Sequence, residues 1–346
     1  MTARCPGMSP DKATAKFNRM QGKLRVSLTH ACQLRCRFCH QEGIESHWNA
    51  LHMPIDYFDA LLNAYAEIGG IYLELTGGEP LLHPRISEIL RMASALMRKV
   101  FLHTNGLQLR EILPELESGC VQLIRLSLHE VGNSEHSRWL LGRSWDYYRV
   151  IENLERVLQT RTPIQFLYTL TGKNAQSLPK VLDLALKFGV DLQLVDLIQS
   201  RKRNTFSLLG YLGGDVIETQ VRKRSRYEAT IRDRTGATLQ IFKTPEGATW
   251  EVKSTHYGLL HTDMCSGCTL RARCGEGIYA LRVDAAGVIK PCLLRQDLDI
   301  KTSVSPIDRS QLHSALANLL ILMMSSSFSD CCERLHDKPE CVSVGR

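Results

Sequence analysis

Three cysteines near the start of the chain, Cys32, Cys36 and Cys39, have the spacing Cys-x3-Cys-x2-Cys. Three thiolates can bind three irons of a [4Fe–4S] cubane and leave the fourth iron without a protein ligand. An iron with an open coordination site can bind a small molecule and pass one electron to it. A structural zinc ion is the alternative, but zinc takes four ligands, usually from two paired elements. The spacing therefore predicts a redox-active iron–sulfur cluster.

A second group of four cysteines lies in the last third of the chain: Cys265, Cys268, Cys274 and Cys292. Residues 274–292 have the pattern of a hairpin with Gly287 at its turn, which would bring the two end cysteines together. Four thiolates could fully ligate a second [4Fe–4S] cluster, or three could bind it and leave one iron for substrate. A four-cysteine zinc site is the remaining alternative.

A third group, Cys331, Cys332 and Cys341, could supply a missing ligand to this second site. Clustered cysteines of this kind are typical of metal ligands in a reducing cytosol rather than of disulfides. The first twenty residues lack the apolar core of a secretory signal. The most apolar stretch, 315–324, is about half as long as a membrane span. The sequence therefore predicts a cytoplasmic protein without a membrane segment.

The charge balance points to the kind of partner. The chain has 43 basic and 36 acidic residues, a net charge of +7. Two basic clusters, at 201–203 and 222–226, concentrate part of this charge, and no aromatic residues interleave them. Nucleic-acid surfaces usually combine basic and aromatic side chains. The clusters therefore favour a small anionic substrate over RNA or DNA.

Short apolar runs alternate with longer segments of helical periodicity between residues 24 and 199. The predicted strands cover 24–29, 71–75, 100–104, 122–128, 164–170 and 192–197. Strands that alternate with crossover helices form a parallel sheet, here a partial (β/α)6 barrel whose active site lies at the C-terminal ends of the strands.

The regular alternation ends near residue 199. A β-hairpin is predicted over 237–254, and a last helix follows Asp308, with Gln311 at the spacing of a capping box. We expect an N-terminal extension at 1–22, the barrel at 23–205, and a region with linker, hairpin and second cysteine group at 206–346.

Polar motifs stand at the C-terminal ends of several predicted strands. They are Thr76-Gly77-Gly78-Glu79-Pro80 after the second strand, Thr104-Asn105-Gly106 after the third, Ser127 near the end of the fourth, and Gly172 and Asn174 after the fifth. Together with the cysteine loop, in which Phe38 precedes the third cysteine, these motifs resemble the radical S-adenosylmethionine (SAM) superfamily. The segment LRVSLTHACQLRCRFC resembles its molybdenum-cofactor GTP cyclase branch.

The resemblance implies an enzyme that cleaves SAM reductively to a 5′-deoxyadenosyl radical, with electrons from flavodoxin or ferredoxin. It assigns the following to SAM binding: Phe38, Gly77, Gly78, Glu79, Pro80, Thr104, Asn105, Ser127 and Asn174. The second cysteine group resembles the auxiliary cluster domains called twitch and SPASM, which implies a second [4Fe–4S] cluster.

The substrate is predicted to differ from that of the cyclase. The cyclase branch has basic residues where this chain has Ile164 and Gln193, and its C-x-R-x-R element is out of step here. We expect a small anionic substrate, such as a nucleotide, nucleoside or sugar derivative, that is epimerised, oxidised, decarboxylated or rearranged. Candidate residues on the substrate side are Arg25, His129, Glu130, Tyr168, Arg271 and Arg273.

Two other functions fit parts of the sequence. Peptide-modifying twitch and SPASM enzymes share the motifs, but many carry an N-terminal leader-recognition domain, and only a short stretch precedes the first strand here. A two-cluster electron carrier would need neither the Gly-Gly-Glu-Pro motif nor a barrel. The sequence therefore favours a radical SAM enzyme that acts on a small molecule.

Overall fold

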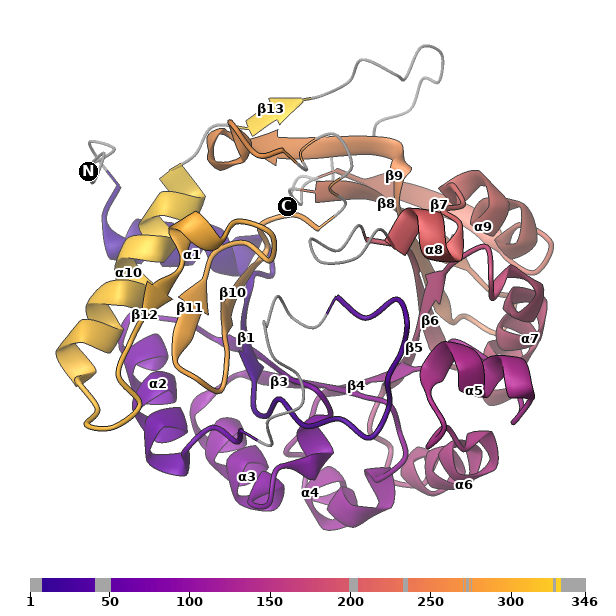
Figure 1. Ribbon diagram of the computed structural model, residues 1–346, viewed down its shortest axis with the longest axis horizontal. Helices are drawn as coiled ribbons and strands as arrows, with labels where there is room; N and C mark the ends of the chain where they lie inside the picture. The colour runs from indigo at the N-terminus through magenta and orange to yellow at the C-terminus, as the bar shows by residue number, and fades with distance from the viewer. Residues whose placement is uncertain are drawn as a thin grey trace.

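The computed structural model describes residues 8–40, 51–198, 205–232, 236–269, 271, 274, 276–325 and 328–330. Six strands pair in parallel in the order of the chain: β1 (Lys23–Ser27), β2 (Tyr72–Thr76), β3 (Lys99–Thr104), β4 (Leu123–Ser127), β5 (Ile164–Leu170) and β6 (Asp191–Asp196). Helices lie outside the curved sheet (Figure 1): α2 (Ile55–Glu67), α3 (Ile86–Leu96), α4 (Leu113–Glu117), α5 (Glu135–Leu141), α6 (Tyr147–Leu158) and α7 (Leu178–Phe188). The predicted partial barrel is confirmed.

Alternation along the strands decides which side chains face the helices and which face the barrel interior. On β4 the buried residues are Ile124 and Leu126, while Arg125 between them is only partly buried. Successive side chains of a strand point to opposite faces, so one face packs against helices and the other lines the interior. On the outer side, α6 buries Val150 and Leu154.

The C-terminal region extends the same sheet at both edges. Next to β1 lie β10 (Ala280–Val283), which is parallel to it, then β11 (Val288–Lys290) and β12 (Ile300–Lys301). Next to β6 lie β9 (Thr249–Thr262), also parallel, then β8 (Gly236–Lys243) and β7 (Arg226–Ile231), while β13 (Phe328–Asp330) pairs with β9. Both predicted hairpins are therefore present, and Gly287 has the positive φ of 78° that its turn requires. The proposed division at residue 205 stays a prediction.

Four further helices flank the sheet: α1 (Pro10–Arg19), α8 (Thr205–Leu209), α9 (Gly214–Val221) and α10 (Arg309–Ser325). The predicted last helix is confirmed, because the Gln311 N–H donates to the Asp308 carboxylate at 2.9 Å. Helix α1 was not predicted. It packs on α10, where the Lys16 ammonium donates to the Met324 carbonyl at 2.6 Å.

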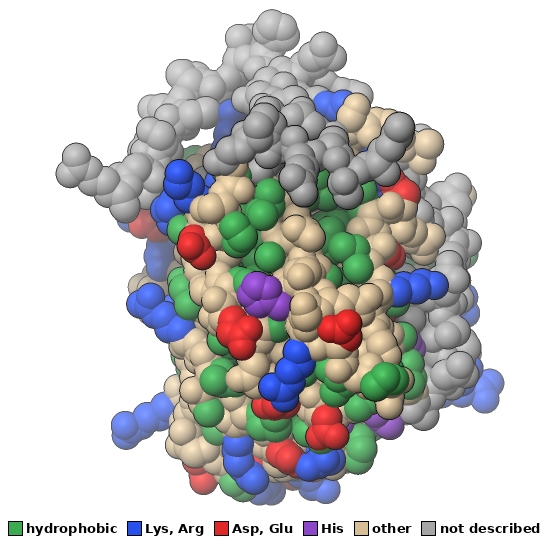
Figure 2. All heavy atoms as spheres, turned by 90° about the vertical axis from the view of Figure 1, so that its left-hand side faces the viewer, with side chains coloured by type: hydrophobic (Ala, Val, Ile, Leu, Met, Phe, Trp, Pro, Cys, Tyr) green, Lys and Arg blue, Asp and Glu red, His purple; other side chains and the backbone are tan. Residues whose placement is uncertain are grey.

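The face on the left of Figure 1 carries hydrophobic, acidic and basic side chains interspersed (Figure 2). No helix in the described part of the chain combines the length and the apolarity that crossing a bilayer requires.

Candidate active site

A cavity of about 360 Å³ is lined by residues from the C-terminal ends of the parallel strands and from the cysteine loop. Its size is in the usual range for small-molecule sites. Most residues predicted to bind the cluster, SAM or substrate line it: Arg25, Cys32, Cys36, Phe38, Cys39, Gly77, Gly78, Glu79, Thr104, Asn105, Ser127 and His129. The structure thus brings motifs from β1 to β4 together at one site.

The cysteine loop is held against the end of α5. The backbone N–H groups of Arg35 and Arg37 donate to carbonyls of α5 at 2.9 Å, and Cys39 N donates to Cys36 O at 3.1 Å. Burial raises the pKa of the Cys32 thiol to about 12, and it raises the pKa of Cys36 well above its ordinary value. The other nearby thiols and Glu79 add to these shifts. Buried thiols of this kind become thiolates only when a positive charge such as iron compensates them.

The Gly-Gly-Glu element contacts the residues just before the first cysteine. Gly78 N donates to Thr29 O and Glu79 N donates to Ala31 O, both at 2.7 Å. A Cβ on Gly78 would lie 2.1 Å from Ala31 O, so no larger residue fits. The glycines therefore let the two backbones approach closely and leave backbone groups facing the cavity.

Glu79 is a buried carboxylate in the cavity wall. It accepts hydrogen bonds from the Thr104 hydroxyl at 2.6 Å and from Asn105 N at 2.8 Å. Burial raises its pKa to about 7, although these hydrogen bonds lower it. An ammonium group placed beside this carboxylate would favour its ionised form. The wall is thus suited to the amino group of an amino acid such as the methionine part of SAM.

His129 packs edge-on against Phe38 of the cysteine loop, with ring centroids 4.6 Å apart. Its Nδ1 accepts from Thr169 N at 3.0 Å, which places the proton of the neutral ring on Nε2. Burial lowers its pKa to about 3, so the ring stays neutral at physiological pH. His129 therefore offers the cavity a neutral hydrogen-bond donor and a flat ring.

An ion network that the sequence reasoning missed forms the floor of the cavity. Glu74 on β2 is fully buried and contacts Arg25, His103 and Arg125 at 2.7, 2.8 and 2.7 Å. These three partners line the cavity, whereas Glu74 lies beneath them. Burial lowers the pKa of His103 to about 4, so the ring is neutral at pH 7. The positive charge beside Glu74 is carried by the two guanidiniums and by the buried Lys23 ammonium, 3.8 Å from the carboxylate. The sequence feature that could have revealed this network is an ionisable residue at an inward-facing position of each of the strands β1 to β4.

The opposite wall of the cavity comes from β6 and β9. Lys253 lines it, lies 4.8 Å from the centroid of the Tyr279 ring, and donates to the Glu276 carbonyl. Gln193 also lines the cavity, where its amide donates to Glu251 at 2.6 Å. The cations of this cavity thus stand on β1, β4 and β9 rather than on β5 or β6.

Three predicted residues lie outside the cavity: Pro80, Tyr168 and Asn174. The Tyr168 hydroxyl donates to Asn174 O at 2.6 Å, and the Tyr168 side chain is fully buried. The Asn174 amide donates to His129 O and Thr169 O, and its oxygen accepts from Thr171. These groups are already hydrogen-bonded within the protein, and their predicted roles toward SAM and substrate stay predictions.

Two other substrate candidates also lie away from the cavity. Glu130 accepts from the Ser177 hydroxyl at 2.6 Å and does not line the cavity, and neither does Arg271. Arg273 and the cluster at 201–203 lie outside the described residues. In the second basic cluster, Arg222 pairs with Glu218 and Arg224 with Asp183 on the surface. Two of the basic residues in this cluster are therefore paired with carboxylates, and none of the cluster lines the cavity.

The second cysteine group is gathered beside Arg295. The thiols of Cys268 and Cys292 raise the pKa of Arg295, after the larger effect of Asp297. Cys292 also raises the pKa of Cys274, whose main shift comes from burial. Among the described residues no three His, Cys, Asp or Glu side chains converge closely enough to hold one metal ion. A second [4Fe–4S] cluster at these cysteines, with a four-cysteine zinc site as the alternative, stays a prediction.

Comparison with known proteins agrees with this geometry. Residues 26–185 match the Radical SAM superfamily. A protein of Methanocaldococcus jannaschii named probable GTP 3′,8-cyclase is 24% identical over 285 residues, which are 82% of this chain and 88% of that protein. A protein of the same name from Sulfurisphaera tokodaii is 27% identical over 289 residues, 82% of this chain and 85% of the relative.

Solved structures share the fold. SuiB of Streptococcus suis bound to the precursor peptide SuiA superposes with a TM-score of 0.58 at 16% identity, over 82% of this chain and 63% of SuiB. The enzyme anSMEcpe with bound AdoMet superposes with a TM-score of 0.53 at 15% identity, over 86% of this chain and 81% of that protein.

Residues 26–185 form a radical SAM domain around the cavity. The chain is a radical SAM enzyme related to proteins named probable GTP 3′,8-cyclase. Enzymes of this superfamily bind SAM and a [4Fe–4S] cluster. The prediction of an enzyme is therefore confirmed, and the alternative of an electron carrier is wrong.

Proposed function

We propose that Cys32, Cys36 and Cys39 hold the [4Fe–4S] cluster and that SAM binds between this loop and Glu79. The three thiols line one cavity, and burial raises the pKa of Cys32 and Cys36, which the positive charge of a metal would offset. Reduced by one electron at the cluster, bound SAM supplies a 5′-deoxyadenosyl radical that removes hydrogen from a substrate C–H bond. A second cluster at Cys265, Cys268, Cys274 and Cys292 would serve electron transfer or substrate binding.

The protein's own groups would orient SAM and exclude water. Glu79 would accept hydrogen bonds from the amino group of SAM, while backbone at Gly77 and Gly78 flanks the methionine part. Thr104, Asn105 and Ser127 add polar contacts in the same wall. Phe38 and His129 place two rings beside the cluster loop, where they would shield the reactive carbon from solvent.

The substrate is proposed to be a small anionic molecule. The observation that supports this is the set of three cations lining the cavity, Arg25, Arg125 and Lys253; Arg25 and Arg125 share the buried carboxylate Glu74 beneath it. Two guanidiniums with planar donor sets suit phosphate or carboxylate. Because Ile164 and Gln193 provide no charge on β5 and β6, the anion would bind toward β1, β4 and β9.

A labelled-substrate experiment tests this proposal. Reconstituted enzyme is incubated with SAM, dithionite and a panel of deuterated nucleotides, nucleosides and phosphorylated sugars. Mass spectrometry then reads deuterium in 5′-deoxyadenosine. Transfer from an anionic compound, with a higher KM in an Arg125→Met variant, is expected. Transfer only from a neutral compound or a peptide would contradict the proposal.

The electron donor is proposed to be flavodoxin or ferredoxin, and the enzyme is proposed to work in the cytoplasm. Every cysteine in the described part of the chain is a free thiol, as a reducing compartment requires.

Replacing Glu79 with glutamine is expected to weaken SAM binding roughly ten- to a hundredfold. A hydrogen bond to a charged group contributes about 1.5–3 kcal/mol, and each 1.4 kcal/mol is about a tenfold change. Equilibrium dialysis with labelled SAM measures the Kd. The matched control is Glu88→Gln, an exposed carboxylate that pairs with Arg85 on the outer surface, and it should leave the Kd unchanged. Equal affinity in Glu79→Gln and the control would refute the assignment.

Replacing Cys292 with alanine is expected to remove about four irons per chain, the content of one cubane. SAM cleavage at the first cluster should survive at least in part, because Cys292 does not line the SAM cavity. Iron analysis and 5′-deoxyadenosine release measure the two effects. Zinc instead of iron at this site in anaerobically purified protein would reject the second cluster.

A further inference from the structure

A patch of basic and aromatic side chains lies on the outer side of the cysteine loop. It consists of the following residues, here called the Arg–Trp patch: Arg35, Arg37, Arg138, Trp139 and Arg143. Trp139 is 38% exposed, one of few large hydrophobic side chains exposed to that degree in the described residues. Arg35, Arg138 and Arg143 are exposed as well.

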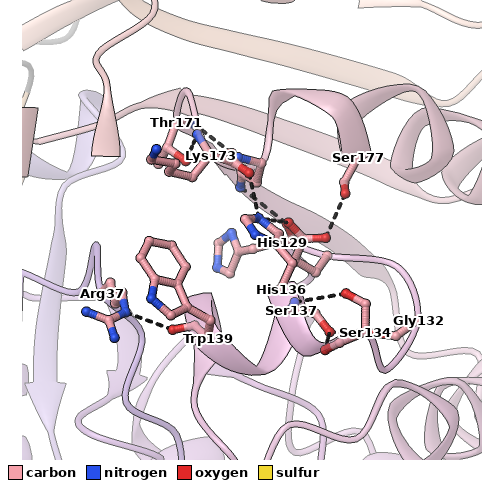
Figure 3. Close-up of polar contacts among 12 residues, drawn as sticks. Arg37, His129, Gly132, Ser134, His136, Ser137, Trp139, Thr171, Lys173 and Ser177 are labelled. Atoms are coloured by element: carbon pink, nitrogen blue, oxygen red, sulfur yellow. Dashed lines mark hydrogen bonds and ion pairs between the residues drawn. The ribbon is translucent and has the colours of Figure 1, made fainter. Parts of the chain in front are cut away.

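The indole of Trp139 is held rigidly on the surface. The Arg37 guanidinium lies 4.3 Å from its centroid, and the His136 ring stacks on it at 5.7 Å and 24° (Figure 3). Arg37 Nε donates to Trp139 O at 2.9 Å, and His136 Nε2 donates to Lys173 O at 2.7 Å. An exposed aromatic ring that is already ordered loses little entropy on docking, which is why such rings often anchor interfaces.

The patch is next to the place where the cluster would bind. Arg37 stands between Cys36 and Phe38 in the chain, and both of these neighbours line the cavity, whereas Arg37 does not. The loop thus presents thiols to the inside and Arg37 to the outside. A protein docked on Trp139 would be separated from the cluster by little more than this loop.

The charge of the patch is strongly one-sided. Residues 33–39 and 135–143 together hold four arginines against one acidic residue, Glu135. Arg138 and Arg143 form no ion pair with a carboxylate of the described residues. By contrast, the face in Figure 2 mixes both signs. A surface of one charge attracts a partner of the opposite charge and speeds its association.

We propose that the Arg–Trp patch is the docking surface of an acidic one-electron carrier protein, and this rests on the proposed cluster site. The carrier brings the electron that each SAM cleavage consumes. For a flavin carrier, the hydroquinone gives one electron and becomes the semiquinone, while the cluster goes from the 2+ to the 1+ state.

The test compares binding and activity in two double variants of the reconstituted holoenzyme. Arg138→Glu/Arg143→Glu reverses the patch charge. Lys12→Glu/Arg19→Glu makes the same charge change on exposed residues of α1, far from α5 (Figure 1). Calorimetry measures the Kd of an acidic flavodoxin at low and high salt, and 5′-deoxyadenosine release is driven by reduced flavodoxin or by dithionite.

The patch variant is expected to raise the flavodoxin Kd roughly tenfold or more at low salt and to lose its salt dependence. Its flavodoxin-driven rate should fall in parallel, while its dithionite-driven rate stays at the wild-type value. The α1 variant should keep the wild-type Kd and both wild-type rates. Trp139→Ala, which keeps all charges, should also raise the Kd.

An unchanged Kd in both patch variants would overturn the docking surface while leaving the enzyme's function intact. If the wild-type protein forms a concentration-dependent dimer that the patch variants lose, while the flavodoxin Kd is unchanged, the patch would instead be an interface with a second copy of the chain. Absence of dithionite-driven SAM cleavage in wild type would reject the proposed function itself.

Discussion

Replacing Cys32 with alanine is expected to remove about four irons per chain and to abolish SAM cleavage. Two remaining thiolates leave a cubane with two exposed irons, which does not persist in a cavity open to solvent and SAM. Cys32 lines the cavity beside Asn105 and Glu79, the groups proposed to hold SAM, so both cofactors depend on its position. Iron analysis and 5′-deoxyadenosine release after dithionite reduction measure the two losses.

The matched control is Cys120→Ala. This thiol is also buried, but it lies 3.5 Å from the Ser118 hydroxyl and does not line the cavity. The control should keep both iron and SAM cleavage. Retained cleavage in Cys32→Ala would contradict the proposed ligand set, because the open iron would then belong to another site.

Replacing Glu74 with glutamine is expected to lower the free energy of unfolding by about 3–5 kcal/mol, the usual cost of breaking a buried ion pair. The side chains of Arg25 and Arg125 are only 11% and 12% exposed and would lose their shared counter-charge. Urea unfolding of the metal-free protein measures the change without interference from cofactors. The control Glu88→Gln breaks an exposed pair and should cost less than about 1 kcal/mol.

The difference in unfolding free energy between wild type and Glu74→Gln should shrink as the pH falls into strong acid. Burial alone would raise the pKa of Glu74, but the nearby cations outweigh it and hold the pKa well below its ordinary value. A carboxyl whose folded pKa is lowered stabilises the protein above its unfolded pKa and loses this contribution as pH falls through the folded pKa. The gap between wild type and Glu74→Gln should therefore persist between pH 5 and 8 and shrink in stronger acid. A gap that widens on acidification would show that Glu74 is not held ionised.

Local patterns predicted the elements and the cofactor motifs well. The predicted strand at 164–170 coincides with β5, because short-range alternation of apolar residues marks a strand. The Gly-Gly-Glu element contacts the residues just before the first cysteine, because both follow the ends of adjacent strands. The parallel pairing of β10 with β1 joins segments more than 250 residues apart and has no local signature. Domain limits drawn from composition could not reveal that one sheet runs through both parts.

The substrate side was harder to predict, because it depends on which strand residues point inward. Arg125 and Lys253 each lie within a strand, β4 and β9, and the sequence of a strand does not show which of its faces lines the cavity. The 222–226 cluster was conspicuous in the sequence but pairs with surface carboxylates. Asn174 follows the end of β5 and Tyr168 lies within that strand, and the two hydrogen-bond to each other and to nearby backbone without lining the cavity.

The arrangement of cations has a consequence for the substrate. Arg25 and Arg125 share Glu74 as a common counter-ion and so are held in position before any ligand binds. Preorganised donors lose little freedom on binding and discriminate strongly against ligands that cannot use them. We therefore expect the enzyme to select an anionic group by position, with Lys253 approaching from the opposite wall.

The proposed function depends on an open iron in a cluster held by Cys32, Cys36 and Cys39. Electron–nuclear double resonance on the reduced protein with SAM labelled with 15N at the amino group and 17O at the carboxylate tests it directly. Hyperfine coupling from both labels to the cluster is expected, with loss of both signals in Cys32→Ala. A reduced cluster that shows neither coupling in the wild-type protein would contradict it.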